Sequence, residues 1–506
     1  MTVAPISLPP RRSALGPPRL RTGGDTHLPE VLGWTAILVF CAVVAAILLI
    51  GRGGTLDFAF PVIGTAVGAI LFATAPRLFL GFAWWLWFLT PEIRRIADFE
   101  GGWNPVNPLM LTPLLVSGIT VVTGLKRVSA LRAKSLFGFV PIFIALAYGT
   151  LVGIVTTGTA VALYSLLVWA VPVLMATHLA IHVDDYPMHR ATLISTFAWG
   201  ALVMGAYGLI QYFVAPPWDT FWMIVSDQLT QGMPYPGEIR VFSTMNSSGP
   251  FAFVISAGLL LLLIDGGRFR LPMAATACAS LMLSLVRAAW LGGALGFVYA
   301  LSCLAPRRRL QAVVVALCAA LALGVTFMTG SVADTISKRF DTLANLEDDG
   351  SFQLRQEFYT EFLSQAVTNV VGAGIGSTSY VTRLGNYGEI SGGFYGDSGI
   401  MQVPFVLGWF GCFLYVGGVA ALLGYGLAGR VPKSDPFLGI AKAIVVMVLA
   451  EMIFENTLIN VMGCCFFTFL GMCLAARRYH ARTAPRTPAV THDSVVTVEV
   501  PAATSH

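Results

Sequence analysis

Apolar runs of membrane-spanning length constrain this sequence more than any other feature. They recur from Val31 to Leu474, and most are long enough to cross a hydrocarbon core of about 30 Å as a helix. Only 11% of the residues are charged, whereas a soluble domain carries about 25%. The sequence therefore predicts an all-α polytopic integral membrane protein, and it excludes soluble enzymes, nucleic-acid binders and secreted disulfide scaffolds.

Hydropathy predicts about 12–14 transmembrane helices. The chain shows no internal repeat, which argues against a transporter built from inverted halves. The fourteen candidate spans are 31–50, 58–74, 78–90, 108–124, 136–155, 158–181, 191–214, 249–264, 271–286, 288–304, 310–328, 400–426, 437–455 and 458–476.

Basic residues in the connections set the expected orientation. With the N-terminus in the cytoplasm, 22 of the 31 Lys and Arg residues fall on the inner side, as the positive-inside rule requires. We therefore expect both termini to be cytoplasmic, with Val31–Ile50 as a retained first helix rather than a signal peptide. Residues 1–28 and 477–506 are predicted to be disordered tails around a membrane domain at 29–476.

Three predicted outer segments, 91–107, 215–249 and 329–399, are too long to be simple turns. The last has helical patterning at 331–346 and 351–367, so we expect an ordered helical loop that covers the outer surface. The eight cysteines all lie in apolar runs without metal-ligand spacing, which is typical of small buried residues.

Two arginines stand near outer helix ends. Arg287 interrupts the apolar stretch SLMLSLVRAAWLGG, and Arg240 precedes a spanning helix on the same side. A cation at the membrane border usually has a partner, and a guanidinium binds phosphate oxygens bidentately. Each is either a ligand for a lipid phosphate or an interfacial loop cation. Asn246 follows Arg240 in the chain. Its neutral side chain would either donate a hydrogen bond to a ligand or cap the next helix.

Arg339 and Arg355 lie in the large outer loop. They are candidates for binding an anionic substrate because the outer side has few other basic residues. The alternative is pairing on a solvated surface with neighbouring carboxylates of the same loop, namely Asp341, Glu347, Asp348 and Glu357.

A glycine-rich turn, VVGAGIGS, follows these helical stretches, with Gly374 and Gly376 as its last two glycines. Its GxGxG spacing is not a dinucleotide fingerprint, because no strand–helix unit surrounds it. Glycines here allow close backbone approach to a ligand or to a helix.

Three carboxylates are candidates for chemistry. Asp397 directly precedes a spanning helix, where it would act as a general base or as an N-terminal cap. Glu451 and Glu455 lie four residues apart on one helix face near an outer end. Intramembrane carboxylates are functional candidates, although these two could instead pair with the arginines.

Three segments together resemble the O-antigen ligase and Wzy-type polymerase superfamily of bacterial membrane glycosyltransferases. They are RVFSTMNSSGPFAFVIS, SLVRAAWLGGALG, and VVGAGIGS followed by DSGIMQVPFVLGWFGCFLYV. The last is similar to a GxGxG turn and then a pattern H-N-x-Y-L-Q with a following E-L-G-x-x-G. The resemblance covers residues 240–426.

The resemblance implies a GT-C-like fold in the bacterial inner membrane and a site that faces the periplasm. It implies that Arg240 and Arg287 hold an undecaprenyl-diphosphate-linked donor, and that Arg339 and Arg355 bind substrate. Family ligases place a histidine where this chain has Asp397, and this difference favours a polymerase that joins repeat units of exopolysaccharide or O-antigen.

The implied chemistry is metal-independent inverting glycosyl transfer without a cofactor. Expected partners are the lipid-linked oligosaccharide, the growing polysaccharide, membrane lipids, and a chain-length regulator or export complex, with no nucleic acid. Two alternatives remain open: a ligase that transfers glycan to lipid A core or another acceptor, and a flippase or transporter of lipid-linked oligosaccharides.

Overall fold

The computed structural model describes residues 27–226, 229–265, 267–314, 316, 369–378 and 398–483. Most of these residues are helical, and among them the only extended pairing is one isolated bridge between Gly232 and Ile239. The chain is an all-α polytopic membrane protein, as the hydropathy predicts. The principal helices are α1 (His27–Leu49), α2 (Leu56–Thr74), α3 (Pro76–Gly101), α4 (Thr112–Gly118), α5 (Val121–Lys126), α6 (Phe139–Thr156), α7 (Thr159–Ile181), α8 (Tyr186–Val214), α9 (Pro217–Val225), α10 (Ser248–Leu262), α11 (Arg270–Leu283), α12 (Arg287–Cys303), α17 (Gly399–Leu427), α18 (Pro436–Glu451) and α19 (Asn460–Thr483).

Eight helical stretches in the described part of the chain are long and apolar enough to cross a membrane. They comprise α1, α2, the α4–α5 pair, α6, α7, α8, α17 and α19. Helices α10 and α11 are apolar but shorter. Fewer helices therefore meet the length criterion than the fourteen spans expected, because several of those spans are short helices and the span at 310–328 lies largely outside the described residues.

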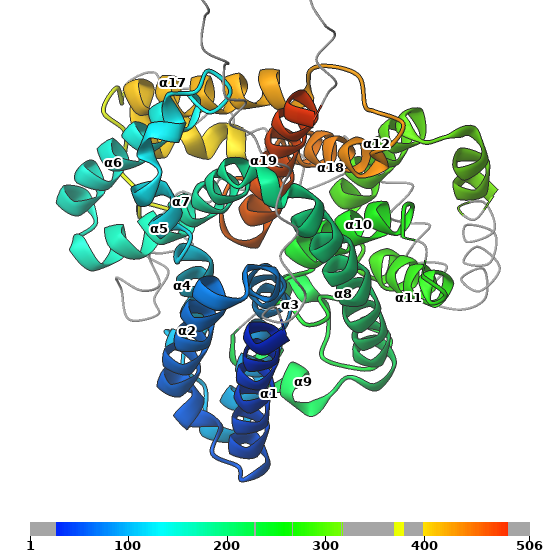
Figure 1. Ribbon diagram of the computed structural model, residues 1–506. Coiled ribbons are helices and arrows are strands. Elements are labelled where there is room, and N and C mark those ends of the chain that lie inside the picture. Colours follow the sequence, from blue (N-terminus) through cyan, green and yellow to red (C-terminus); the bar gives the residue numbers. More distant parts are fainter. Residues whose placement is uncertain are drawn as a thin grey trace, which may run out of the picture.

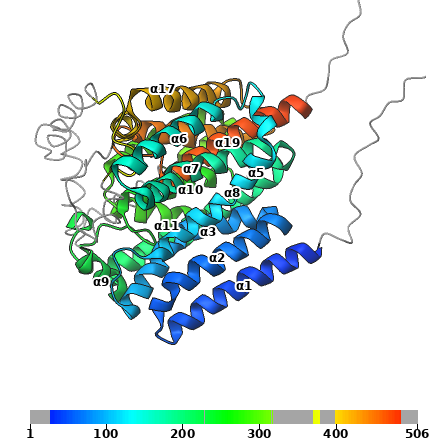
Figure 2. The same cartoon turned by 90° about the vertical axis from the view of Figure 1, so that its left-hand side faces the viewer.

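The helices form one bundle, in which α1, α2 and α3 lie on one side and α12, α17 and α18 on the opposite side (Figures 1 and 2). Helix α19 lies between them, and 89% of its most apolar window is buried. Its Gly471 lets it approach α7 closely, since a Cβ atom there would lie 2.8 Å from Cα of Ala176. The start of α1 and the end of α19 lie at the same end of the bundle, opposite to α9 (Figure 2).

The expected boundary between a span at 78–90 and an outer loop at 91–107 is wrong. Helix α3 continues to Gly101. It does so because its charged second half is buried with partners: Arg95 and Asp98 are 0% and 1% exposed. The expected loop at 215–249 likewise contains a short helix, α9, and the span at 108–124 is divided into α4 and α5.

The predicted tail at 477–506 begins too early, because α19 remains helical to Thr483. Four side chains in its last turns have partners on other elements, namely Arg477, Arg478, His480 and Arg482, the last with Asp184 in the α7–α8 turn. Arg478 donates to the carbonyl of Ala180 at 2.6 Å, and His480 lies 2.8 Å from Asp435. Helix α19 is thereby attached to the α7–α8 turn and to the start of α18.

The glycine-rich turn packs into a break in α17. Gly408 interrupts that helix with φ 62°, and the amide of Trp409 donates to the carbonyl of Val370 at 3.0 Å. On its other side the turn meets α6, where the amide of Ile375 donates to the carbonyl of Gly149 at 2.9 Å. These glycines were expected to allow close approach either to a ligand or to a helix. The described contacts are those of a close approach to helices.

Gly374→Ala should destabilise the protein. Gly374 has φ +85°, and a Cβ atom there would lie 2.5 Å from the amide nitrogen of Gly153. Strain of this kind costs about 1–3 kcal/mol, so we expect a thermal unfolding midpoint lower by several degrees, measured on the purified protein in detergent. Gly424→Ala on α17 is the matched control, since nothing lies within 4 Å of the added methyl. Equal midpoints for the two variants would contradict this account of the turn.

Candidate active site

The candidate site lies at the end of the bundle opposite to the start of α1 and the end of α19. Helices α3, α8 and α18 end there, and α10 and α12 begin there. Arg287 is the first residue of α12, and the preceding turn is unusual, because Leu285 has φ 55°. The N-terminal end of a helix carries a partial positive charge and unpaired amide groups. Arg287 therefore adds a full positive charge to an end that already favours an anion.

Arg240 lies beside the same turn. It donates to the carbonyl of Thr230 at 2.8 Å, and its guanidinium lies 3.4 Å and 3.5 Å from the carbonyls of Ser284 and Leu285. The backbone joins the two segments as well, since the amide of Val241 donates to Leu283 at 3.1 Å. The structure thus places Arg240 at the turn that leads directly into Arg287.

The two glutamates occupy positions made by glycines. Glu451 is 5% exposed at the end of α18, and its carboxylate packs on Gly292 of α12, where any Cβ atom would collide with it. Glu455 packs in the same way on Gly249, in the first turn of α10. Two carboxylates therefore lie against the first turns of α10, which follows Arg240, and α12, which begins with Arg287.

One carboxylate oxygen of this pair is unusual. Oε1 of Glu451 is buried and makes no hydrogen bond to any described residue. A buried polar atom without a partner costs free energy, so such an atom at a helix junction marks a position where a ligand or a proton would be accommodated.

The start of α17 meets the same place. The amide of Gly399 donates to the carbonyls of Met452 and Glu455 at 3.1 Å and 3.3 Å, and the hydroxyl of Ser398 donates to Met452 at 3.2 Å. Ser398 follows Asp397 directly, so the chain at this point is attached to the segment that carries Glu455. Asp397 itself, and also Arg339 and Arg355, lie outside the described residues.

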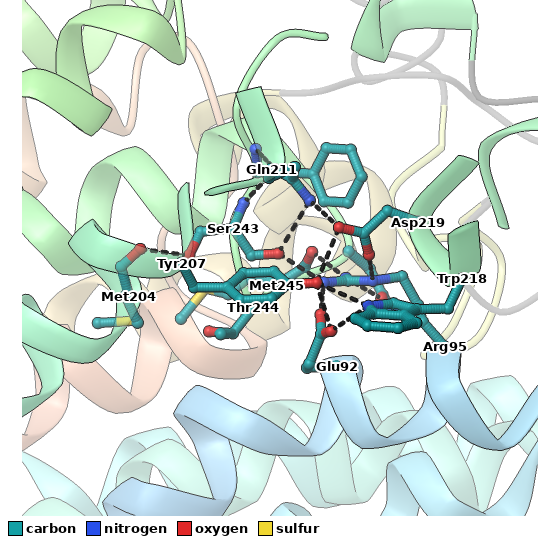
Figure 3. A network of polar contacts seen from close by, with 12 residues as sticks. Glu92, Arg95, Met204, Tyr207, Gln211, Trp218, Asp219, Ser243, Thr244 and Met245 are labelled. Carbon is teal, nitrogen blue, oxygen red and sulfur yellow. Dashed lines mark hydrogen bonds and ion pairs between the residues drawn. The ribbon is translucent and has the colours of Figure 1, made fainter. Parts of the chain in front are cut away.

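The segment after Arg240 is held by a buried polar network that the sequence analysis missed (Figure 3). Its centre is Arg95 of α3, which is 0% exposed. Arg95 pairs with Glu92 and with Asp219 of α9, the latter at 2.7 Å. It also donates to the backbone carbonyls of Ser243 and Met245, each at 2.5 Å.

A second layer of contacts completes the network. Gln211 of α8 accepts hydrogen bonds from the amides of Phe242 and Ser243 at 3.0 Å and 2.8 Å, and donates to Asp219 at 2.8 Å. The Tyr207 hydroxyl lies within 2.9 Å of both Glu92 and Asp219. These bonds hold Ser243 at φ 52°, which turns the chain from Arg240 into α10.

Asn246 belongs to this network rather than to the surface. Its side-chain oxygen accepts from Arg95 at 3.3 Å, and its amide nitrogen lies 3.9 Å from the sulfur of Met110. The spacing Glu92–Arg95, two opposite charges three residues apart directly after an apolar stretch, was the signal that could have revealed the network.

Four predicted site residues are thus brought together, namely Arg240, Arg287, Glu451 and Glu455, while Asn246 lies behind them. Gly374 and Gly376 lie apart, against α6 and α7. Within the ranges that the structure describes, no group of three or more His, Cys, Asp or Glu side chains has an arrangement that would hold a metal ion.

A family comparison agrees with this geometry. Residues 271–416 match the family model described as O-antigen ligase. Within these bounds the chain is similar to the O-antigen ligase family. The matched stretch begins at α11, contains Arg287, and ends within α17. No curated protein matches the chain. Arg240, Glu451 and Glu455 lie outside the matched stretch, and the fold brings them close to Arg287.

Gly292→Ala should destabilise the protein through Glu451. The new methyl collides with the buried carboxylate, and overpacking of this kind costs about 1–3 kcal/mol. The adjacent Gly293→Ala is the matched control, because its nearest neighbour would be the Ser256 hydroxyl at an ordinary 3.6 Å. Thermal unfolding of the purified variants measures both effects.

A double variant tests the cause. In a Glu451→Ala background the carboxylate is gone, so Gly292→Ala should lose at least half of its effect on the unfolding midpoint. An equal effect in both backgrounds would show that the glycine is required for another reason.

Proposed function

We propose that the protein is a polysaccharide polymerase at the periplasmic face of the bacterial inner membrane. It would join oligosaccharide repeat units carried on undecaprenyl diphosphate. The observation that carries the proposal is the convergence of Arg240 and Arg287 with Glu451 and Glu455 at one end of the bundle. The O-antigen ligase domain supports the reaction class, because this family transfers lipid-linked glycans.

In this proposal the two arginines and the start of α12 bind the diphosphate of the donor. The bond between the anomeric carbon and the diphosphate oxygen breaks, and negative charge develops on the leaving group. Fixed guanidinium groups and helix-terminal amides stabilise that charge without reorganisation. The arginines thereby take the role that a divalent cation has in other glycosyltransferases, and the donor reacts without a metal.

A carboxylate would activate the acceptor hydroxyl. The hydroxyl of the acceptor sugar attacks the anomeric carbon from the face opposite to the diphosphate, which inverts the configuration, and a carboxylate takes the hydroxyl proton. Asp397 is assigned this role because it precedes Ser398, which is attached beside Glu455. Arg339 and Arg355 would close over the donor or the glycan, and Glu451 and Glu455 would orient Arg287 and the substrate.

The orientation forms part of the proposal. Both helix ends nearest the termini lie at one end of the bundle and the candidate site at the other (Figure 2), so cytoplasmic termini place the site in the periplasm. A growing polysaccharide leaving this site would pass to a chain-length regulator or export complex.

A ligase is the second candidate, because the matched family model is described as O-antigen ligase. It would use the same donor-binding arginines and differ only in the acceptor. Family ligases have a histidine at the position of Asp397. The aspartate in this chain therefore favours the polymerase.

One complementation experiment tests both the site and the reaction. In a strain that lacks the gene, wild-type protein and Arg268→Ala should restore long glycan chains, because Arg268 is exposed at the start of α11. Arg287→Ala should lower polymer formation by about 100-fold or more, with normal amounts of inserted protein. Surface and lipid-linked glycans, separated by size, provide the readout.

The glycan species in the deletion strain distinguish the functions. Single repeat units that persist on the lipid or on the surface support the polymerase. Full-length chains that accumulate on the lipid carrier would replace it with the ligase. Repeat units retained on the cytoplasmic side would indicate a flippase, and normal polymer with Arg287→Ala would refute the assigned site.

A further inference from the structure

The opposite end of the bundle contains a histidine-lined cavity that the proposed reaction does not use. Its volume is about 230 Å³. His189 and Gln211 lie about 22 residues apart on α8, which at 1.5 Å per residue separates this cavity from the Arg95 network by roughly 33 Å. The cavity lies among the ends of α5, α7 and α8, beside the C-terminal turns of α19.

The cavity has a basic wall and an apolar wall. His178, His182 and His189 lie together, with ring centroids 4.5 Å and 6.1 Å from the central His178. Lys126 and Arg127 are exposed at its edge. Among the described residues that line the cavity, Asp185 is the single acidic one, so these side chains have an excess of positive charge even when all three imidazoles are neutral.

One polar atom of the buried histidines has no hydrogen-bond partner among the described residues. His178 is held by a 2.8 Å hydrogen bond between its Nδ1 and the hydroxyl of Thr123. His189 is 1% exposed, and its Nδ1 has no hydrogen-bond partner among the described residues. A buried ring nitrogen without a partner is costly, and this ring forms part of the cavity wall.

Size and position restrict the ligand class. Pockets for drug-sized molecules have volumes of about 300–1,000 Å³, so this cavity suits a compact group rather than an oligosaccharide. The apolar wall includes Phe72 and Phe79, whose rings lie 5.7 Å and 6.3 Å from that of His178. A basic pocket between spanning helices at the membrane border, with an apolar side, is typical of a site for an anionic headgroup.

We propose that this cavity binds a phosphate group, carried by an anionic phospholipid headgroup or free in solution. Lys126 and Arg127 supply the charge at the edge, and the imidazoles supply hydrogen bonds inside. The apolar wall would accommodate the first carbon atoms attached to a lipid phosphate. The site is separate from the proposed glycan chemistry and concerns the anchoring of the bundle at its opposite membrane face.

Thermal unfolding of the full-length protein in detergent tests the proposal. The added probes are phosphatidylglycerol, inorganic phosphate, and a neutral glycolipid without phosphate, all at equal ionic strength. A ligand that binds only the folded protein raises the unfolding midpoint. We expect phosphatidylglycerol or phosphate to raise it by about 3 °C or more, and the neutral glycolipid to have no such effect.

Matched charge variants locate the effect. Lys126→Gln/Arg127→Gln should weaken the apparent affinity by at least about tenfold, since charge-assisted bonds are lost. Arg132→Gln/Lys134→Gln removes the same charge from exposed positions outside the cavity and should leave the affinity unchanged.

Each outcome either tests the proposal or identifies the source of the phosphate group. A midpoint shift with phosphatidylglycerol alone assigns a lipid headgroup, and a shift with inorganic phosphate assigns the phosphate itself. No shift with either probe, or an equal loss of affinity in both double variants, would overturn the proposal.

Discussion

The arrangement of the candidate site depends on one buried guanidinium. Arg95 has no exposed surface, and it connects α3, α9 and the segment between Arg240 and α10. Two carboxylates, Glu92 and Asp219, compensate its charge, and two backbone carbonyls and the side-chain oxygen of Asn246 accept its other hydrogens. Removal of one partner from a buried ion network costs about 3–5 kcal/mol, because an uncompensated charge stays behind. The hydrogen bonds of Arg95 therefore hold the segment that carries Arg240 on its side away from the site.

A second constraint is space. The carboxylates of Glu451 and Glu455 reach the starts of α12 and α10 only because Gly292 and Gly249 have no side chains. Glycine also lets α19 approach α7 and lets the turn at Gly374 enter between α6 and α17. In a membrane, small residues of this kind allow close helix packing where hydrophobic burial provides little driving force.

Much of the fold was predictable because the bilayer imposes it. Spans such as those of α7, α8 and α19 follow from continuous apolar runs of sufficient length. The end of α3 was not predictable in this way. Charges such as Glu92 and Arg95 predict a loop when they are read alone, and their partners come from residues more than 100 positions away.

The site was partly predictable for the same reason. Arg240, Arg287, Glu451 and Glu455 are isolated charges next to apolar runs, and such charges mark functional positions in membrane proteins. The glycines of the GxGxG turn behave differently. Their sequence pattern does not show whether they approach a ligand or a neighbouring helix. The contacts with Gly149 and Gly153 show that they approach a helix.

Hydrogen–deuterium exchange measured by mass spectrometry tests the central role of Arg95 most directly. In Arg95→Met, the amides of Phe242 and Ser243, which are bonded to Gln211, should exchange at least about tenfold faster, because the loss of about 1.4 kcal/mol of local stability has that effect. Arg94→Met is the matched control, since Arg94 bonds to Asp98 and to the carbonyl of Asn104 instead. Faster exchange at 242–246 in the Arg95 variant alone is the predicted result. Equal exchange at 242–246 in both variants would contradict the account.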